Sequence, residues 1–255
     1  MFPFFRPGFW NVRLWGKLFI YPGIDLHTRS RYRYLSRFIS SGPIDTLDAG
    51  FGNGALSYAA YRKGNRVLAI SNDVPEVEKA GKFYSWLRTD HERLKFLLYN
   101  LYDLPALNLT FDQIICSETL EHIRQDQKII RFFYQALRPG GVLHLCCPNS
   151  LHPLHGFVPP DKSEDDGAHV RSGYTIEGLR KMLREAGFTP TLSAGLGIPA
   201  ITRLDQILRK INNKIGNGAV LPLFLLTLPL QILDRLNPPI PFSIYIKATK
   251  PHRDK

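Results

Sequence analysis

Short apolar runs alternate with amphipathic segments along the middle of the chain. The runs predict strands at 44–49, 66–71, 95–99, 112–117 and 142–147. The segments between them predict helices at 54–63, 75–88 and 125–137. Two more strands are expected at 188–194 and 242–249, after a helix that Thr175 caps and Gly187 ends. Because strand and helix alternate, the pattern predicts an α/β fold whose parallel strands are joined by right-handed crossovers.

The chain on either side of this core has a different pattern. Residues 24–40 interleave arginines with aromatic and aliphatic residues, and they predict a helix across the entrance to the sheet. Before the last strand, apolar positions at helical spacing predict an amphipathic helix at 203–215, and the charge-free stretch 215–233 follows it. Pro222 and Pro229 interrupt that stretch, so a full membrane crossing is disfavoured. A hydrophobic lid, an oligomer contact and a segment lying in the membrane interface stay open as interpretations.

Three glycines two residues apart, Gly50, Gly52 and Gly54, follow the first predicted strand. Glycine has no Cβ, so its backbone can adopt positive φ and a ligand can lie directly against it. The loop therefore predicts the floor of a nucleotide-like cofactor site at the carboxyl end of this strand. The spacing Gly50-x-Gly52-x-x-Ala55 also fits the dinucleotide fingerprint, so a nicotinamide cofactor stays open on this motif.

Later segments distinguish between these cofactors. The strand from Phe111 runs into the polar cluster Ser117-Glu-Thr-Leu-Glu-His122, and the turn Leu137-Arg-Pro-Gly-Gly141 precedes the next strand. With the glycine loop, they resemble the class I S-adenosylmethionine-dependent methyltransferases, especially the subgroup of ubiquinone and menaquinone methyltransferases. The resemblance covers roughly residues 44–190. It implies a Rossmann-like, seven-stranded, mostly parallel sheet flanked by helices, with the last strand antiparallel between the fifth and sixth, and S-adenosylmethionine as cofactor.

The resemblance also implies which residues bind the cofactor. They are Asp48, Gly50, Gly52, Gly54, Ser71, Asp73, Asn100, Leu101 and Ser117. Asp48 and the glycine backbone would hold the methionine half of the cofactor. Two positions depart from the family pattern. Ser71 stands where an acid usually contacts the ribose, with Asp73 two positions later, and Asn100 replaces the acid beside the adenine. These departures leave a weakened cofactor site open.

Candidate acid–base residues lie mainly in the loop after the fifth strand. His169 is the first candidate for a general base and His155 the second, because imidazole has an ordinary pKa near neutrality. Tyr174 is expected to orient the acceptor, and Glu118 to face the reacting methyl group. Glu118 and His122 are four residues apart, as two metal ligands on a helix can be. Without a clear third ligand, no metal is predicted.

Charge is unevenly distributed along the chain, whose formal net charge is +11. Residues 1–40 carry seven Lys or Arg against one acid, residues 203–255 carry nine against three, and the segment between them is nearly neutral. The basic, apolar flanks favour an anionic membrane surface or an acidic substrate as partner. The run Arg29-Ser-Arg-Tyr-Arg-Tyr34 could stack bases, but the nearly neutral core argues against a nucleic-acid substrate. The three cysteines lie on predicted strands and suggest no disulfide framework.

The predicted organisation has four parts. They are a basic aromatic cap at 1–40, a methyltransferase core at 41–196, a hydrophobic and basic insertion at 197–241, and a final strand with its tail at 242–255. The N-terminal helix and the insertion are expected to cover the site.

The expected function is methyl transfer from S-adenosylmethionine, by in-line displacement, to a small-molecule, lipid or glycan-type acceptor. Oxygen is favoured as the methylated atom, because the fourth strand lacks an amine-gripping motif and the following loop carries histidines. The alternatives are an NAD(P)-dependent reductase and a non-catalytic membrane-associated protein with a vestigial cofactor site. No signal-peptide pattern is present, so a cytoplasmic location is expected, with peripheral membrane contact as an option. The acceptor and the oligomeric state stay open.

Overall fold

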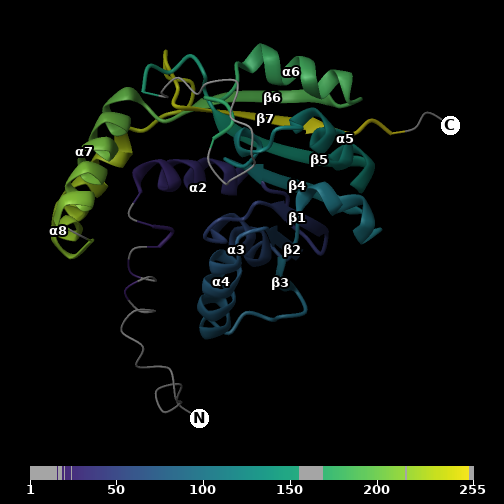
Figure 1. Ribbon diagram of the computed structural model, residues 1–255, viewed down its shortest axis with the longest axis horizontal. Helices are drawn as coiled ribbons and strands as arrows, with labels where there is room; N and C mark the ends of the chain where they lie inside the picture. Colours follow the sequence, from purple (N-terminus) through teal and green to yellow (C-terminus); the bar gives the residue numbers. More distant parts are fainter. Residues whose placement is uncertain are drawn as a thin grey trace, which may run out of the picture.

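A single seven-stranded sheet organises the protein (Figure 1). The computed structural model describes residues 16, 19, 21–23, 25–154, 169–215 and 217–252, excluding the side chains of 212–220. The strands are β1 (Asp45–Ala49), β2 (Arg66–Ser71), β3 (Leu94–Leu98), β4 (Phe111–Ser117), β5 (Leu137–Pro148), β6 (Thr189–Leu196) and β7 (Ser243–Thr249). Their order is β3-β2-β1-β4-β5-β7-β6, and β7 is antiparallel to both of its neighbours. The predicted Rossmann-like sheet is confirmed, including the place of its antiparallel strand.

Helices cover both faces of this sheet. They are α3 (Ala55–Arg62), α4 (Val74–Trp86), α5 (Asp126–Ala136) and α6 (Ile176–Glu185), with the 3-10 turns η2 (Leu101–Leu107) and η3 (Leu120–His122) at the ends of β3 and β4. Successive residues of a strand point to opposite faces, so both faces of the central strands are apolar. On β5, for example, Leu145 and Cys147 join the core beneath α5 and α6, whereas Cys146 faces the opposite layer.

A buried hydrogen-bond chain crosses the central strands. Gln113 on β4 donates from its amide nitrogen to Thr46 Oγ1 and to Asn65 Oδ1, at 2.9 Å each. Its oxygen must therefore accept from His144 Nε2, 3.0 Å away, and His144 Nδ1 accepts from the Tyr245 hydroxyl at 2.8 Å. Burial lowers the pKa of His144 to about 3. The sheet thus carries a neutral histidine in its interior with both ring nitrogens satisfied.

The N-terminal helix and the insertion pack together. We call the cover unit α2 (Leu26–Phe38), α7 (Pro199–Ile215), α8 (Asn217–Thr227) and η4 (Leu228–Leu233). Figure 1 shows α7 and α8 side by side at the edge of the molecule, and Leu26, Leu208 and Phe224 form their shared apolar core with α2. Hydrogen bonds also hold α2 against the insertion. The Leu26 backbone nitrogen donates to Asp205 Oδ1 at 2.8 Å, and the Tyr34 hydroxyl donates to the Asp234 carbonyl at 2.6 Å.

The charge-free stretch after the predicted amphipathic helix is itself helical. Pro222 lies inside α8 and Pro229 lies in the first turn of η4, where a proline costs no intrahelical hydrogen bond. In the described part of the chain, every helix is too short or too polar to cross a membrane. The amphipathic helix predicted at 203–215 begins earlier, at Pro199.

Candidate active site

The glycine turn after β1 forms the floor of the site. Gly50, Gly52 and Gly54 have φ values of +76°, +56° and +74°. A Cβ added to Gly50 would lie 2.3 Å from Thr119 Oγ1, and one added to Gly54 would lie 2.6 Å from the Tyr84 ring. A Cβ on Gly52 would meet no atom within 4 Å. Gly50 and Gly54 therefore allow close packing of the turn, whereas the position of a Gly52 side chain is open space in the cleft.

A cleft runs above this turn along the carboxyl ends of the parallel strands. Its larger part has a volume of about 510 Å³ and reaches from the glycine turn to α2 and the end of β4. Its smaller part, about 150 Å³, extends over η2. The parts share Gly50, Ser71, Asn72, Thr119 and His122. The shared lining makes them one elongated cleft, at the position where open α/β sheets bind ligands.

A buried carboxylate lies beneath the turn. Asp48 is 1% exposed, lines the larger part of the cleft and accepts a hydrogen bond from Ser57 Oγ on α3 at 2.5 Å. Burial raises the pKa of Asp48 from 3.8 to about 7, although the Ser57 hydrogen bonds partly oppose this shift. A cationic ligand above the turn would favour the ionised form.

A second carboxylate, Glu76, lies beside the end of β2, and it was not predicted from the sequence. Ser71, which replaces the usual acid, donates from its hydroxyl to Glu76 Oε2 at 2.8 Å. Glu76 lies in the first turn of α4 and lines the same cleft, as does Asp73, which caps α4 by accepting from the Glu76 backbone nitrogen. Glu76 thus places an acid beside the position where this chain lacks the acid of the family pattern.

The smaller part of the cleft is narrow and largely apolar. Asn100 and Leu101 line it together with Tyr99 and Ile123. The Asn100 side-chain oxygen accepts from the Tyr102 backbone nitrogen at 2.9 Å, which caps η2. A carbonyl oxygen has a second lone pair, so Asn100 can still accept a hydrogen bond from a ligand.

The opposite end of the cleft lies between β4 and α2. Ser117 and Glu118 line it, and Glu118 has a positive φ of 54°. The Glu118 carboxylate accepts from Ser243 Oγ at 2.9 Å and pairs with Arg31 of α2 at 3.4 Å. This end of the cleft therefore has a cation from the cover unit, Arg31, and a carboxylate at the end of β4, Glu118.

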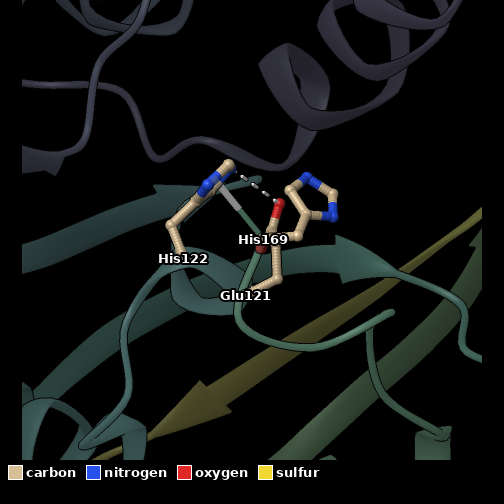
Figure 2. A group of neighbouring side chains, drawn as sticks. All are labelled: Glu121, His122 and His169. Atoms are coloured by element: carbon tan, nitrogen blue, oxygen red, sulfur yellow. Dashed lines mark ion pairs between the residues drawn. The ribbon is translucent and has the colours of Figure 1, made fainter. Parts of the chain in front are cut away.

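Beside this end, two side chains of η3 and one from the segment after β5 lie close together (Figure 2). Glu121, His122 and His169 each offer a ligand atom, and these atoms lie within 4.8 Å of one another. The two imidazole rings meet edge to face, with centroids 4.5 Å apart. Burial and the neighbouring Glu118 raise the pKa of Glu121 well above its ordinary value. The group differs from the pair of possible ligands seen in the sequence, since Glu121 stands in it in place of Glu118 and His169 joins it from the chain after β5.

Two other predicted residues have different positions. Tyr174 is buried outside the cleft lining, where its hydroxyl donates to Asp126 at 2.8 Å and contacts the Leu120 carbonyl and Arg171. It fastens the segment after β5 to η3. His155 lies outside the described residues.

Comparisons with known proteins agree with this geometry. The family model described as a methyltransferase domain matches residues 47–145. A ubiquinone biosynthesis O-methyltransferase of Xylella fastidiosa (strain M23) is 34% identical over 133 residues, which cover 50% of this chain and 52% of that one. The chain thus spans about half the length of the curated relatives it matches.

Solved structures share the fold. Magnesium protoporphyrin IX methyltransferase from Synechocystis PCC 6803, solved with bound S-adenosylmethionine, has a TM-score of 0.56 at 14% identity over 88% of this chain and 80% of that one. The cyclase SpnF has a TM-score of 0.60 at 19% identity over 88% and 82%. The matched family model includes the glycine turn. Residues 47–145 match a methyltransferase domain.

The cleft of this methyltransferase domain fits its cofactor. Gly52 leaves open space against which the ligand backbone can lie, and Asp48 places a buried carboxylate near the cationic methionine end. The Ser71–Glu76 pair lies in the middle, where ribose hydroxyls need acceptors, and the slot at Leu101 suits a flat adenine ring. The lining therefore offers groups that would hold the methionine, ribose and adenine parts of S-adenosylmethionine, despite both departures from the family pattern.

Gly52→Ala should weaken S-adenosylmethionine binding by at least about tenfold, because the methyl group enters the cleft. An alanine at positive φ costs about 1–2 kcal/mol of unfolding free energy. Gly50→Ala should destabilise the methyltransferase domain more, because its Cβ would overlap Thr119. Titration calorimetry and urea unfolding of both variants test this contrast, and unchanged affinity in Gly52→Ala would place the ligand away from the turn.

Proposed function

We propose that the protein transfers the methyl group of S-adenosylmethionine to an oxygen of a small hydrophobic acceptor. The observation that carries this proposal is the continuous cleft, which joins a cofactor-shaped half to an end lined by Glu118, His122 and Arg31. The name of the Xylella relative, an O-methyltransferase of ubiquinone biosynthesis, supports oxygen as the methylated atom and a hydrophobic acceptor.

The cofactor supplies the methyl group on a cationic sulfur that leaves readily. The chain has to align the acceptor, exclude water and remove a proton. Arg31 and Tyr32 of α2 line the cleft together with the glycine turn, so this helix would help to position the acceptor. His169 remains the first candidate for the general base, since it lies beside His122, which lines the cleft.

A two-stage assay tests this function. Calorimetry should show one S-adenosylmethionine site per chain, and label from methyl-labelled cofactor should enter the organic phase of a bacterial lipid extract incubated with the protein. The labelled product should release labelled methyl iodide on cleavage with hydrogen iodide, as an O-methyl ether does. Absence of cofactor binding contradicts the proposal, and label that enters only water-soluble amines contradicts the choice of acceptor.

We also propose that the acceptor arrives from an anionic membrane surface to which the cover unit binds. Leu226, Ile232 and Leu233, on α8 and η4, are 75%, 79% and 63% exposed. Arg33 of α2 lies next to this apolar surface, because its guanidinium donates to the Gln231 carbonyl of η4 at 2.6 Å. Exposed aliphatic side chains beside arginines are typical of segments that lie in the membrane interface.

The double variant Leu226→Asp/Ile232→Asp should bind vesicles of phosphatidylglycerol at least about tenfold more weakly, since each aliphatic side chain contributes about 1.5–3 kcal/mol when buried. Vesicle flotation measures this. Leu109→Asp is the matched control, because Leu109 is also exposed (51%) but lies between η2 and β4. Equal flotation of wild type and double variant would contradict the membrane contact.

A further inference from the structure

Hydrogen bonds between two distant segments fix the group of Glu121, His122 and His169. The Val170 backbone nitrogen donates to the Glu121 carbonyl at 3.0 Å, directly after His169. The Arg171 guanidinium donates to the Arg124 carbonyl at 3.1 Å. The chain that follows β5 is therefore tied to η3, so the approach of His169 to the other two side chains follows from the backbone.

Glu121 is buried without a hydrogen-bond partner. Its exposed fraction is 0%, and neither carboxylate oxygen accepts a hydrogen bond from the part of the chain that the structure describes. His122 Nδ1 is also buried and lacks a hydrogen-bond partner among those residues. Removing a carboxylate from water without a partner costs several kcal/mol. The group is therefore incomplete as protein alone.

The neighbouring arginines already have carboxylate partners. Arg31 pairs with Glu118 at 3.4 Å, and Arg171 pairs with Asp126. Within the described residues, Glu121 forms an ion pair with His122, whose Nε2 lies 3.8 Å from Oε1. Figure 2 shows the His122 imidazole paired with the carboxylate and the His169 ring on its other side. A cation seated among the three side chains would complete the group.

We propose that Glu121, His122 and His169 bind one divalent cation of the zinc class. Two imidazoles and one carboxylate form a donor set that suits Zn²⁺ and Co²⁺, and a three-ligand site leaves a coordination position open. Ligand atoms around such an ion lie about 3.3 Å apart, given metal–ligand bonds of about 2.0–2.1 Å. The ligand atoms now lie within 4.8 Å of one another, so binding of the ion would require the side chains to move closer together.

The open position would face the acceptor, since His122 lines the cleft beside Glu118. This consequence rests on the proposed oxygen methylation. A cation there lowers the pKa of a hydroxyl that it contacts, so the proton passes to water before transfer. An oxygen lone pair then forms the C–O bond, and the electron pair of the broken C–S bond stays on sulfur. His169 would act as a ligand in place of its predicted role as base.

Cobalt titration of the chelator-treated protein tests the site independently of activity. Wild type should bind one Co²⁺ per chain with the visible absorption of a low-symmetry site, and Zn²⁺ should displace it. His122→Ala and His169→Ala should each weaken binding by about a hundredfold or more. Glu121→Gln keeps the shape of the side chain but removes its negative charge, so it should also weaken Co²⁺ binding. The matched control is His91→Ala, an exposed histidine near Ser85 on α4, which should bind as wild type does.

Equal Co²⁺ affinity in wild type and both histidine variants, with circular dichroism showing folded protein, would overturn the metal site. Absence of stoichiometric binding by wild type would overturn it too. Calorimetry of the wild type with S-adenosylmethionine separates this outcome from failure of the proposed function, because it measures cofactor binding in a protein whose three residues are unchanged. If His169 acts through the ion, chelation should reduce wild-type methyl transfer to the level of His169→Ala, and Zn²⁺ should restore it only in wild type.

Discussion

Glu76→Ala should weaken S-adenosylmethionine binding by about 10- to 100-fold. Glu76 Oε2 lies 2.8 Å from Ser71 Oγ, and Glu76 lines the cleft at the end of β2, where the resemblance to the family implies the ribose hydroxyls. A hydrogen bond to a charged group contributes about 1.5–3 kcal/mol, which corresponds to this range of affinity. Titration calorimetry with the cofactor and with its demethylated product measures the effect.

The control for this prediction is Glu78→Ala, which removes an acid of the same helix that pairs with Lys82 at the surface. It should bind the cofactor as wild type does. The Ser71→Ala/Glu76→Ala pair extends the test: if both residues hold one ribose, their effects should not be additive. Wild-type affinity in Glu76→Ala would leave ribose recognition to Asp73 and show that the cleft uses a different acid.

The sheet could be predicted from sequence because its signals are local and mutually consistent. Apolar runs such as 112–117 and the turn at Gly50 mark where strands begin and end, and alternation with helices determines parallel pairing. The charge-free segment was harder. It forms α8 and η4 because the Phe224 side chain packs with Leu26 of α2, a tertiary contact that no local pattern shows.

The site was partly predictable for the same reason. Residues in the glycine turn and at the ends of β2 and β4 follow from the strand order, and Asp48, Ser71 and Ser117 do line the cleft. Glu76 and Arg31 could not be found this way, since one acts from the next helix and the other from a helix before the first strand. His169 reaches Glu121 only through the pairing of loops that are far apart in sequence.

Tyr174 illustrates the opposite case. A tyrosine in the loop after the fifth strand suggested an acceptor contact, because such loops lie over the carboxyl ends of strands. The hydroxyl is instead held by Asp126 and the Leu120 carbonyl, and burial raises the pKa of Tyr174 above its ordinary value. Sequence position thus identified the right loop, whereas side-chain direction depended on the hydrogen-bond partners that η3 and α5 provide.

Asp48→Asn should stabilise the ligand-free protein at neutral and higher pH and weaken cofactor binding at least about tenfold. Burial raises the pKa of Asp48 from 3.8 to about 7, so the native state holds a proton that the unfolded chain releases within this window. Stability therefore falls as pH rises from 3.8 to about 7, by an amount on the order of 4 kcal/mol. Asparagine carries no titrating proton, so the stability of the variant should not fall in this way as pH rises.

Urea unfolding at about pH 4 and about pH 8 measures the change, and the gain should appear only at the higher pH. Asp45→Asn, on the same strand, is the matched control with the opposite sign. The Arg66 and Arg138 guanidiniums lower the pKa of Asp45. Loss of the Asp45 carboxylate should therefore destabilise the protein at neutral pH and matter less as pH falls through that pKa.

A destabilised Asp48→Asn at about pH 8 would mean that the buried carboxylate has a cationic partner in the free protein. Stronger cofactor binding in that variant would mean that the methionine end lies elsewhere in the cleft, because a cationic ligand over Asp48 gains its attraction from the ionised carboxylate.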